Sequence, residues 1–328
     1  MLERGVMMKA VVLEKTCNAD ELEVSEVEIP EVKDGWVLVK VLGFGINRAE
    51  VILRDYEADE DYIELPVIPG IECVGEVVDS SNTRFKSGDR IVALMGGMGR
   101  SFDGGYAEYA LLPEKIVFKI DEDVFDKLTL EEIIAIPETY FTAYGSLMSL
   151  NLIKDNTLLI RGATSALGLS AIQIAKPIGC EIFATSRSEE RFDKLKSNGA
   201  DECFADDGCL AEKLKCDKVL ELVGPKTLED SMECLNRGGI CCVTGILGGI
   251  EYMDEFDPIK IIPNGCYLTS FFSNYPTQEI MDSLFDFIVE NNIKPEISRV
   301  FNNLEDIGKA HALMESNMAK GKIIFKLE

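Results

Sequence analysis

The stretch from residue 156 to residue 179 constrains the fold of this chain more than any other. It begins with a short apolar run, Leu158 to Ile160, which is typical of a strand buried on both faces of a parallel sheet. Apolar residues then recur at helical spacing between residues 167 and 175. Small residues fill the turn between the two segments, where a backbone could approach a pyrophosphate closely and the helix start would favour negative charge. The segment therefore predicts a strand, a tight turn and a helix that could bind a dinucleotide.

The glycine pattern of this turn matches the GxGxxG motif of dinucleotide-binding folds only weakly. The three glycine positions fall on Ala163, Ser165 and Gly168, and only the last is glycine. An ordinary strand-to-helix turn of some other α/β protein is therefore an alternative for this segment alone. The next segment favours nucleotide binding, because a second predicted strand ends about 20 residues on, where a dinucleotide fold contacts the adenosine ribose.

No acidic residue stands at the end of that second strand, where Thr185 is followed by Ser186 and Arg187. An Asp or Glu there would accept hydrogen bonds from a ribose 2′-OH and repel a 2′-phosphate, whereas hydroxyls and a guanidinium favour the phosphate. We therefore predict NADPH rather than NADH, with Ser186, Arg187 and Arg191 near the 2′-phosphate. The alternative is that Arg187 and Arg191 are solvated charges at the start of the next helix.

Composition excludes several classes of partner. The 328 residues, 46% of them hydrophobic, can bury a large core and suggest two domains. The net charge of −25, from 33 basic and 58 acidic residues, would repel nucleic acid and anionic membranes. We find no apolar run long enough to span a membrane and no signal-peptide pattern at the first residues. We therefore expect a cytoplasmic protein that binds neither nucleic acid nor membrane.

Cysteine and histidine usage argues against disulfides and against a histidine-based site. The ten cysteines are scattered without a CxxC pair, and we interpret them as free, mostly buried thiols in a reducing compartment. The chain has a single histidine, His311, so a histidine-rich metal site is impossible. We interpret His311 as a packed or surface residue of a helix.

The sequence pattern changes near residue 125. Up to about residue 113 the chain shows short strands broken by Gly, Pro and Asp, which indicates an antiparallel, barrel-like β domain. Strands and helices alternate from residue 156 on, and six strands are the full set of a doubly wound fold. We expect one domain from residues 1–125 and 271–328, and a Rossmann domain from residues 126–270. The six strands are predicted at residues 157–161, 181–185, 201–204, 217–223, 239–244 and 265–270.

Short motifs in a fixed order extend along the chain from Met8. They include VKVLGFGIN at residues 39–47, PGIE at 69–72, GGYAEY at 104–109 and GKII at 321–324. Together they resemble the medium-chain dehydrogenase/reductase superfamily, and within it the zinc-independent, zeta-crystallin-like quinone oxidoreductases. The resemblance implies an α/β protein with a GroES-like β-barrel catalytic domain and a doubly wound Rossmann domain.

The residues that bind zinc in other members of that superfamily are replaced here. Zinc alcohol dehydrogenases have a cysteine where this chain has Asn47, and a Gly-His-Glu motif where it has Gly70-Ile71-Glu72. The lobe with four cysteines is also missing, because residues 95–100 contain no thiol. We therefore predict no metal. Ile52, at a position where many quinone reductases have tyrosine, leaves the substrate open.

Loss of the metal directs the functional prediction. Without a Lewis acid, ketone chemistry loses its main electrostatic aid, whereas quinones and enones accept hydride into a delocalised system. We predict an NADPH:quinone oxidoreductase-like enzyme that reduces a quinone or an activated C=C bond of a small molecule, as a homo-oligomer (dimer or tetramer). Asn47 would support the developing charge, and Tyr56 is the nearest candidate proton donor, although a packing role is equally consistent. The alternatives are an enal, enone or enoyl-thioester reductase, and a non-catalytic NADPH-binding protein with a regulatory or structural role.

The resemblance further implies cofactor contacts by motif position. Asn47 and Thr142 would line the nicotinamide, and the turn of Ser165, Ala166, Leu167 and Gly168 would hold the pyrophosphate. The remaining walls of the cofactor site would be Val223, Ile246, Leu247, Ser270, Phe271 and Phe272.

Overall fold

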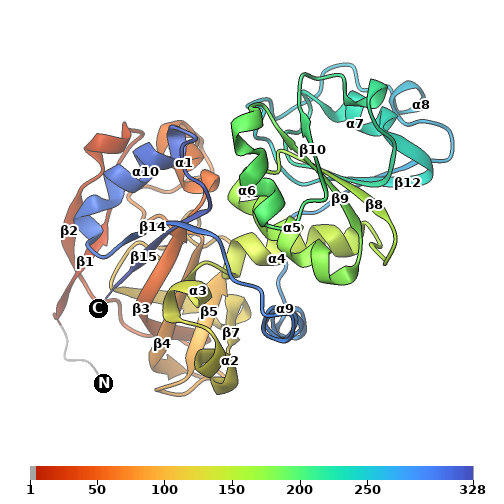
Figure 1. Cartoon of the computed structure of the whole chain (residues 1–328). Coiled ribbons are helices and arrows are strands. Elements are labelled where there is room, and N and C mark those ends of the chain that lie inside the picture. The colour runs from red at the N-terminus through yellow and green to blue at the C-terminus, as the bar shows by residue number, and fades with distance from the viewer. Residues whose placement is uncertain (1–4, 328) are drawn as a thin grey trace. The chain divides into compact units, whose positions relative to one another are not determined.

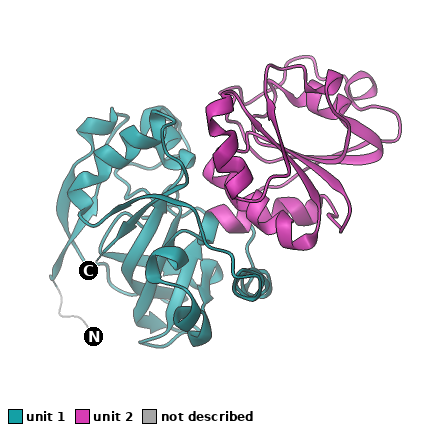
Figure 2. Ribbon diagram, viewed as in Figure 1, with its two compact units in different colours: residues 1–138, 274–328 teal, residues 139–273 magenta. Residues whose placement is uncertain are grey.

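The computed structural model describes residues 5–327, so the outer ends of the expected domain ranges, residues 1–4 and 328, lie outside it. The chain divides into two compact units, coloured separately in Figure 2. Unit 1 is formed by Met1–Glu138 together with Asn274–Glu328, and unit 2 by Thr139–Ser273. Two domains of an α/β protein, one with an antiparallel sheet and one doubly wound, are thereby confirmed.

Unit 2 is built on a parallel sheet of six strands in the order β10-β9-β8-β11-β12-β13 (Figure 1). Counted along the chain this is the order 3-2-1-4-5-6, in which the chain direction across the sheet reverses between β8 and β11. All six predicted strands are confirmed. Their bounds are β8 Thr157–Arg161, β9 Glu181–Ser186, β10 Glu202–Ala205, β11 Cys216–Glu221, β12 Leu235–Val243 and β13 Tyr267–Ser270.

The central strand and its helix follow from the sequence pattern. Leu158, Leu159 and Ile160 are fully buried, as expected for a strand covered on both faces. Helix α5, Ala166–Ile178, ends where Gly179 adopts the left-handed conformation with φ 89°. The other helices with residues in unit 2 are α4 Pro137–Ser149, α6 Phe192–Ser197, α7 Leu228–Glu233 and α8 Pro258–Ile261.

Unit 1 contains a largely antiparallel sheet with the order β14-β15-β3-β4-β5-β7, and β6 also pairs with β3. The C-terminal strand β15 pairs with β3, which confirms that the tail of the chain returns to the first domain. A separate pair, β1 and β2, is also antiparallel. The bounds are β1 Met7–Val11, β2 Val24–Glu28, β3 Trp36–Ile46, β4 Glu72–Ser81, β5 Arg90–Leu94, β6 Tyr109–Pro113, β7 Val117–Lys119, β14 Ile297–Phe301 and β15 Lys322–Lys326.

The first boundary between the units lies at residue 138 rather than at the expected residue 125. Helix α3, Leu130–Ile134, packs against β3, β4 and β15 of unit 1. Lys326 also pairs with Glu131 at 2.8 Å. The other helices of unit 1 are α1 Arg48–Asp55, α2 Glu122–Lys127, α9 Gln278–Glu290 and α10 Ile307–Glu315. Residues 5–327 also contain short 3₁₀ turns at Ala19–Glu21, Glu57–Asp59, Glu114–Ile116, Glu189–Arg191, Leu210–Glu212 and Leu304–Asp306.

Histidine and cysteine take the structural roles that the sequence suggested. His311 is buried on α10, and its Nε2 lies 3.2 Å from the Tyr106 hydroxyl. All ten cysteines are free thiols, and six of them are buried. Among the helices of residues 5–327, none is long and apolar enough to cross a membrane.

Candidate cofactor site and buried charge cluster

The turn between β8 and α5 has the geometry of a phosphate-binding helix start. Ser165 caps α5, because its hydroxyl accepts a hydrogen bond from Gly168 N at 3.0 Å and donates one to Gly162 O at 3.0 Å. A Cβ at Gly168 would lie 2.5 Å from the Cα of Ala163, so only glycine allows α5 to start this close to the turn. The predicted residues Ala166 and Leu167 occupy the first two helical positions, whose N–H groups have no acceptor within the helix.

The loops after β11 and β12 lie together beside this turn. Leu247 N donates to Leu222 O at 3.0 Å and Gly248 N donates to Val223 O at 2.8 Å. A Cβ at Gly162 would be 3.1 Å from a methyl carbon of Leu247 and 3.5 Å from one of Val223. The structure therefore brings the predicted residues Val223 and Leu247 to the turn, and Ile246 lies on the same loop.

The residues of unit 2 that are predicted to lie near the nicotinamide are held together mainly by contacts of their neighbours. Thr142 is buried on α4, and the neighbouring Ser146 hydroxyl lies 2.9 Å from the Thr244 hydroxyl at the end of β12. Phe271 packs edge-on against Phe141 of the same helix, with ring centroids 5.7 Å apart. Ser270 ends β13, and Phe272 is exposed. These residues lie at the carboxyl end of the sheet, as the general rule for ligand sites requires.

The end of β9 carries the residues predicted to contact a 2′-phosphate. The Ser186 hydroxyl already donates to Ser188 O at 2.8 Å and accepts from Ser188 N at 3.1 Å, so it shapes the turn. Arg187 is exposed, and within residues 5–327 its side chain makes no hydrogen bond or ion pair. Arg191 is half-buried at the start of α6. An uncommitted guanidinium beside a turn of hydroxyl residues is chemically suited to a phosphate.

Taken together, unit 2 fits a dinucleotide. The carboxyl end of its sheet combines the capped start of α5, the close approach of helix and strand at Gly168, and the loops that follow the strands. Ser165, Ala166 and Leu167 would hold a pyrophosphate, and the end of β9 would meet the adenosine ribose.

Unit 1 holds a second candidate site, a buried cluster of Asn47, Glu50, Glu72 and Lys322. In the sheet, β3 lies between β4 and β15. Asn47 directly follows β3, while Glu72 begins β4 and Lys322 begins β15, so antiparallel pairing places all three at one end of these strands. A Cβ at Gly45 would lie 2.3 Å from both Glu72 and Lys322, so glycine in β3 makes room for the pair.

The hydrogen bonds of this cluster fix the orientation of the Asn47 amide. Lys322 Nζ donates to Asn47 Oδ1 at 2.5 Å, and it also pairs with Glu72 Oε1 at 2.7 Å. Asn47 Nδ2 donates to Glu72 Oε1 at 2.9 Å and to Glu50 Oε1 at 3.3 Å. Because ammonium can only donate and carboxylates accept, no flipped amide would satisfy these partners. Both amide hydrogens of Asn47 are therefore used within the cluster in this structure.

Glu50 is the titratable group that burial perturbs most in this cluster. It is fully buried on α1, and its carboxylate accepts hydrogen bonds from Asn47 N at 2.7 Å and Ile71 N at 3.0 Å. Loss of hydration raises the pKa of Glu50 to about 7, against the lowering effects of the Ile71 hydrogen bond and of Lys322. The cluster can therefore take up or release a proton near neutral pH.

Sequence reasoning missed Glu50 and Lys322. Glu50 stands three residues after a helix-capping Asn47, and this spacing of a capping box was a usable local signal. Lys322 gave no such signal, because lysine at the start of an apolar strand is ordinarily solvated. Its side chain is only 3% exposed here.

The structure does not bring the predicted proton donor Tyr56 to Asn47. The two residues flank opposite ends of α1, which spans Arg48–Asp55. The two residues are nine positions apart, so the rise of an α-helix separates them by about 13 Å along the helix axis. Tyr56 is 47% exposed, whereas Asn47 is buried.

The donor set of the cluster does not fit a zinc ion. Asn47 and Ile71 stand where cysteine and histidine ligands would be needed, and Glu72 is paired with a cation already. In the part of the chain that the structure describes, residues 5–327, no group of three or more His, Cys, Asp or Glu is placed to hold a metal.

Comparison with known proteins identifies the family. Residues 33–122 match the sequence model described as "Alcohol dehydrogenase GroES-like domain", and residues 166–290 match that of "Zinc-binding dehydrogenase". Human quinone oxidoreductase is 33% identical over 238 residues, which cover 69% of this chain and 69% of that protein. This chain belongs to the medium-chain dehydrogenase/reductase superfamily.

Within the medium-chain dehydrogenases/reductases, the chain stands in the quinone oxidoreductase-like branch and is an oxidoreductase of that kind. The quinone oxidoreductase of Coxiella burnetii shares the fold, with a TM-score of 0.84 and 24% identity over 98% of this chain and 100% of that one. The Bacillus subtilis protein yhfP, solved with NAD bound, has a TM-score of 0.83 and 26% identity, with coverage of 98% and 100%. The GroES-like and Rossmann domains implied by the motifs are confirmed.

Proposed function

We propose that this oxidoreductase is an NADPH-dependent reductase that transfers hydride to a quinone or an activated C=C bond without zinc. The observation that carries the proposal is the buried Lys322 ammonium, which pairs with Glu72 at 2.7 Å and bonds Asn47 at 2.5 Å. Of these residues, Asn47 stands where zinc alcohol dehydrogenases have a cysteine ligand to the metal. A fixed positive charge there stands in for part of the electrostatic aid that a metal would give.

The substrate class follows from the weakness of that aid. A single ammonium paired with Glu72 polarises a carbonyl less than Zn²⁺ does, so an isolated ketone is a poor acceptor. Quinones and conjugated carbonyl compounds spread the charge of an added hydride over several atoms. Relatives named quinone oxidoreductase support this substrate class.

The residues of unit 2 have separate roles in holding the cofactor, whose nicotinamide supplies the hydride when bound. The N–H groups of Ala166 and Leu167 bind the pyrophosphate, and Gly168 permits its approach. Val223 and Leu247 shape the walls beside the turn. Thr142 on α4, with Ile246, Ser270, Phe271 and Phe272, borders the nicotinamide end.

The choice of NADPH over NADH rests on the end of β9. No acid follows Thr185, and Arg187 is exposed without a partner among residues 5–327. The yhfP structure contains NAD and therefore supports a nicotinamide cofactor without supporting the 2′-phosphate. The expected homo-oligomeric state and cytoplasmic location stay predictions.

A substrate panel tests the reaction and the metal together. The purified protein is expected to oxidise NADPH with quinones and enones, with far lower rates on simple ketones and on an enoyl thioester. Prolonged EDTA treatment should leave the rate unchanged, and elemental analysis should find no stoichiometric zinc. One zinc per chain that EDTA removes together with activity would refute the zinc-free mechanism, and turnover of the thioester alone would replace the substrate class. Tight NADPH binding without turnover of any acceptor would favour the non-catalytic alternative.

Substitution of Arg187 by alanine tests the cofactor. Each charge-assisted hydrogen bond contributes roughly 1.5–3 kcal/mol, so NADPH binding should weaken by about 10- to 100-fold while NADH binding stays nearly constant. Isothermal titration with both nucleotides measures this. Arg237→Ala is the matched control, because Arg237 is also an exposed arginine and lies near the opposite end of the sheet, on β12. Equal weakening of both nucleotides by Arg187→Ala would show a structural role for Arg187.

A further inference from the structure

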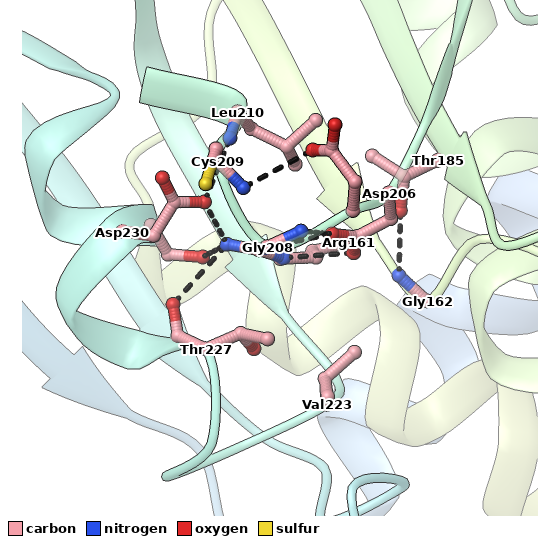
Figure 3. A network of polar contacts seen from close by, with 12 residues as sticks. Arg161, Gly162, Thr185, Asp206, Gly208, Cys209, Leu210, Val223, Thr227 and Asp230 are labelled. Carbon is pink, nitrogen blue, oxygen red and sulfur yellow. Dashed lines mark hydrogen bonds and ion pairs between the residues drawn. The ribbon is translucent and has the colours of Figure 1, made fainter. Parts of the chain in front are cut away.

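A buried arginine that no motif predicted lies at the end of the central strand β8. Arg161 is fully buried, and all its bonding goes to the loops after β10 and β11 and to α7 (Figure 3). Its Nε donates to Asp206 Oδ2 at 2.9 Å and its Nη2 to Asp206 Oδ1 at 2.7 Å. Its Nη1 donates to Asp230 at 2.6 Å, to Ser231 Oγ at 3.1 Å and to Thr227 O at 3.2 Å.

The two acids lie on different sides of Arg161. Figure 3 shows Asp206 on the side of Thr185 and Gly162, and Asp230 on the opposite side. Asp206 directly follows β10, and its N–H donates to Ser186 O at 2.9 Å. Because β9 lies between β10 and β8, the Arg161–Asp206 pair spans the end of β9.

The end of β9 is where a dinucleotide-binding fold contacts the adenosine ribose. This chain lacks the acid of β9 itself, but Asp206 brings a carboxylate to the same place from the next strand. A free carboxylate there would accept hydrogen bonds from a 2′-OH and repel a 2′-phosphate. Here both oxygens of Asp206 accept from Arg161. This bidentate pair occupies the carboxylate and offsets part of its charge, since Arg161 is shared with Asp230.

We propose that the Arg161–Asp206 pair is a determinant of cofactor choice: by holding Asp206, Arg161 makes the end of β9 compatible with a 2′-phosphate. This inference rests on the proposed use of NADPH. Arg161 is a positioning residue, because it acts on the nucleotide through Asp206. Arg187 supplies the attraction, and Arg161 removes the repulsion.

The experiment compares 2′,5′-ADP with 5′-AMP, which differ by the 2′-phosphate, and needs no turnover. Titration calorimetry gives the ratio of their dissociation constants for the wild type and each variant. Arg161→Met exposes the Asp206 charge and should lower the preference for 2′,5′-ADP by about tenfold, as expected for a charge a few ångströms from a phosphate. Asp206→Asn should raise the preference several-fold. The double variant, which removes both charges, should return close to the wild-type ratio.

Asp230→Asn is the matched control. It also removes a carboxylate that pairs with Arg161, but this carboxylate lies on the side away from β9. It should change the ratio less than Asp206→Asn does. If Arg161→Met fails to fold, the comparison of Asp206→Asn with Asp230→Asn decides alone, because a merely structural pair would alter both nucleotides equally.

The outcomes separate this inference from the proposed function. A wild type that prefers 2′,5′-ADP, with a ratio unmoved by Arg161→Met and Asp206→Asn, overturns the role of Arg161 and leaves NADPH in place. A wild type without preference refutes the NADPH assignment, and a ratio that still moves with Asp206 would keep the Arg161–Asp206 pair as a determinant. Equal effects of Asp206→Asn and Asp230→Asn also overturn the inference.

Discussion

Substitution of Lys322 by methionine is expected to lower the free energy of unfolding by about 3–5 kcal/mol, which is the usual cost of breaking a buried ion pair by removing one partner. The variant leaves Glu72, whose side chain is 0% exposed, without its cation. It also removes the donor that fixes the Asn47 amide. Urea unfolding at pH 7, followed by circular dichroism, measures the change.

A second lysine of the same strand provides the control. Lys326 pairs with Glu131 at 2.8 Å, but the two side chains are 39% and 32% exposed. Exposed pairs contribute only about 0–1 kcal/mol, so Lys326→Met should change stability little. Similar small losses for both variants would show that the Lys322 cluster is solvated. The double variant Lys322→Met, Glu72→Gln should recover part of the loss, because it removes the unpaired charge of Glu72.

Substitution of Glu50 by glutamine is expected to change the pH dependence of stability. Burial raises the pKa of Glu50 to about 7 in the folded chain, while an unfolded glutamate titrates near its ordinary value of about 4.3. Between these values the folded chain holds a proton that the unfolded chain has released. The favourable contribution is therefore fully present below about pH 4.3 and is lost as pH rises through about 7, by about 4 kcal/mol in total.

Glutamine cannot titrate, so the variant should lack this loss. Its stability relative to wild type should rise by about 3 kcal/mol between pH 4.5 and pH 8, whatever offset the lost hydrogen bonds cause at all pH values. Unfolding curves at half-unit pH steps measure the difference. Glu131→Gln is the control of opposite sign, because a hydrogen bond from Lys326 lowers the pKa of Glu131. A constant offset between wild type and Glu50→Gln would contradict a raised pKa for Glu50.

Local patterns in the sequence were sufficient for the Rossmann unit. Its strands are short apolar runs and its first helix has a clear period, so neighbouring residues carry the information. The turn at Ser165 and the acid-free end of β9 follow directly from residue order. The GroES-like unit was harder to predict from sequence, because its sheet joins segments that are distant in the chain. The packing of α3 on β3 places the boundary at residue 138 instead of residue 125.

The sequence by itself determined the fold class and the strand, turn and helix around Ser165, and it predicted the cofactor and the absence of zinc, because each depends on short motifs within the chain. Only the tertiary structure decided how the charged residues are used. Lys322 meets Asn47 across 275 positions and Arg161 meets Asp206 across 45, so no local pattern could pair them. Burial then makes the loss of one partner of such a pair costly and raises the pKa of Glu50, because desolvation is a property of the packed core and not of any segment.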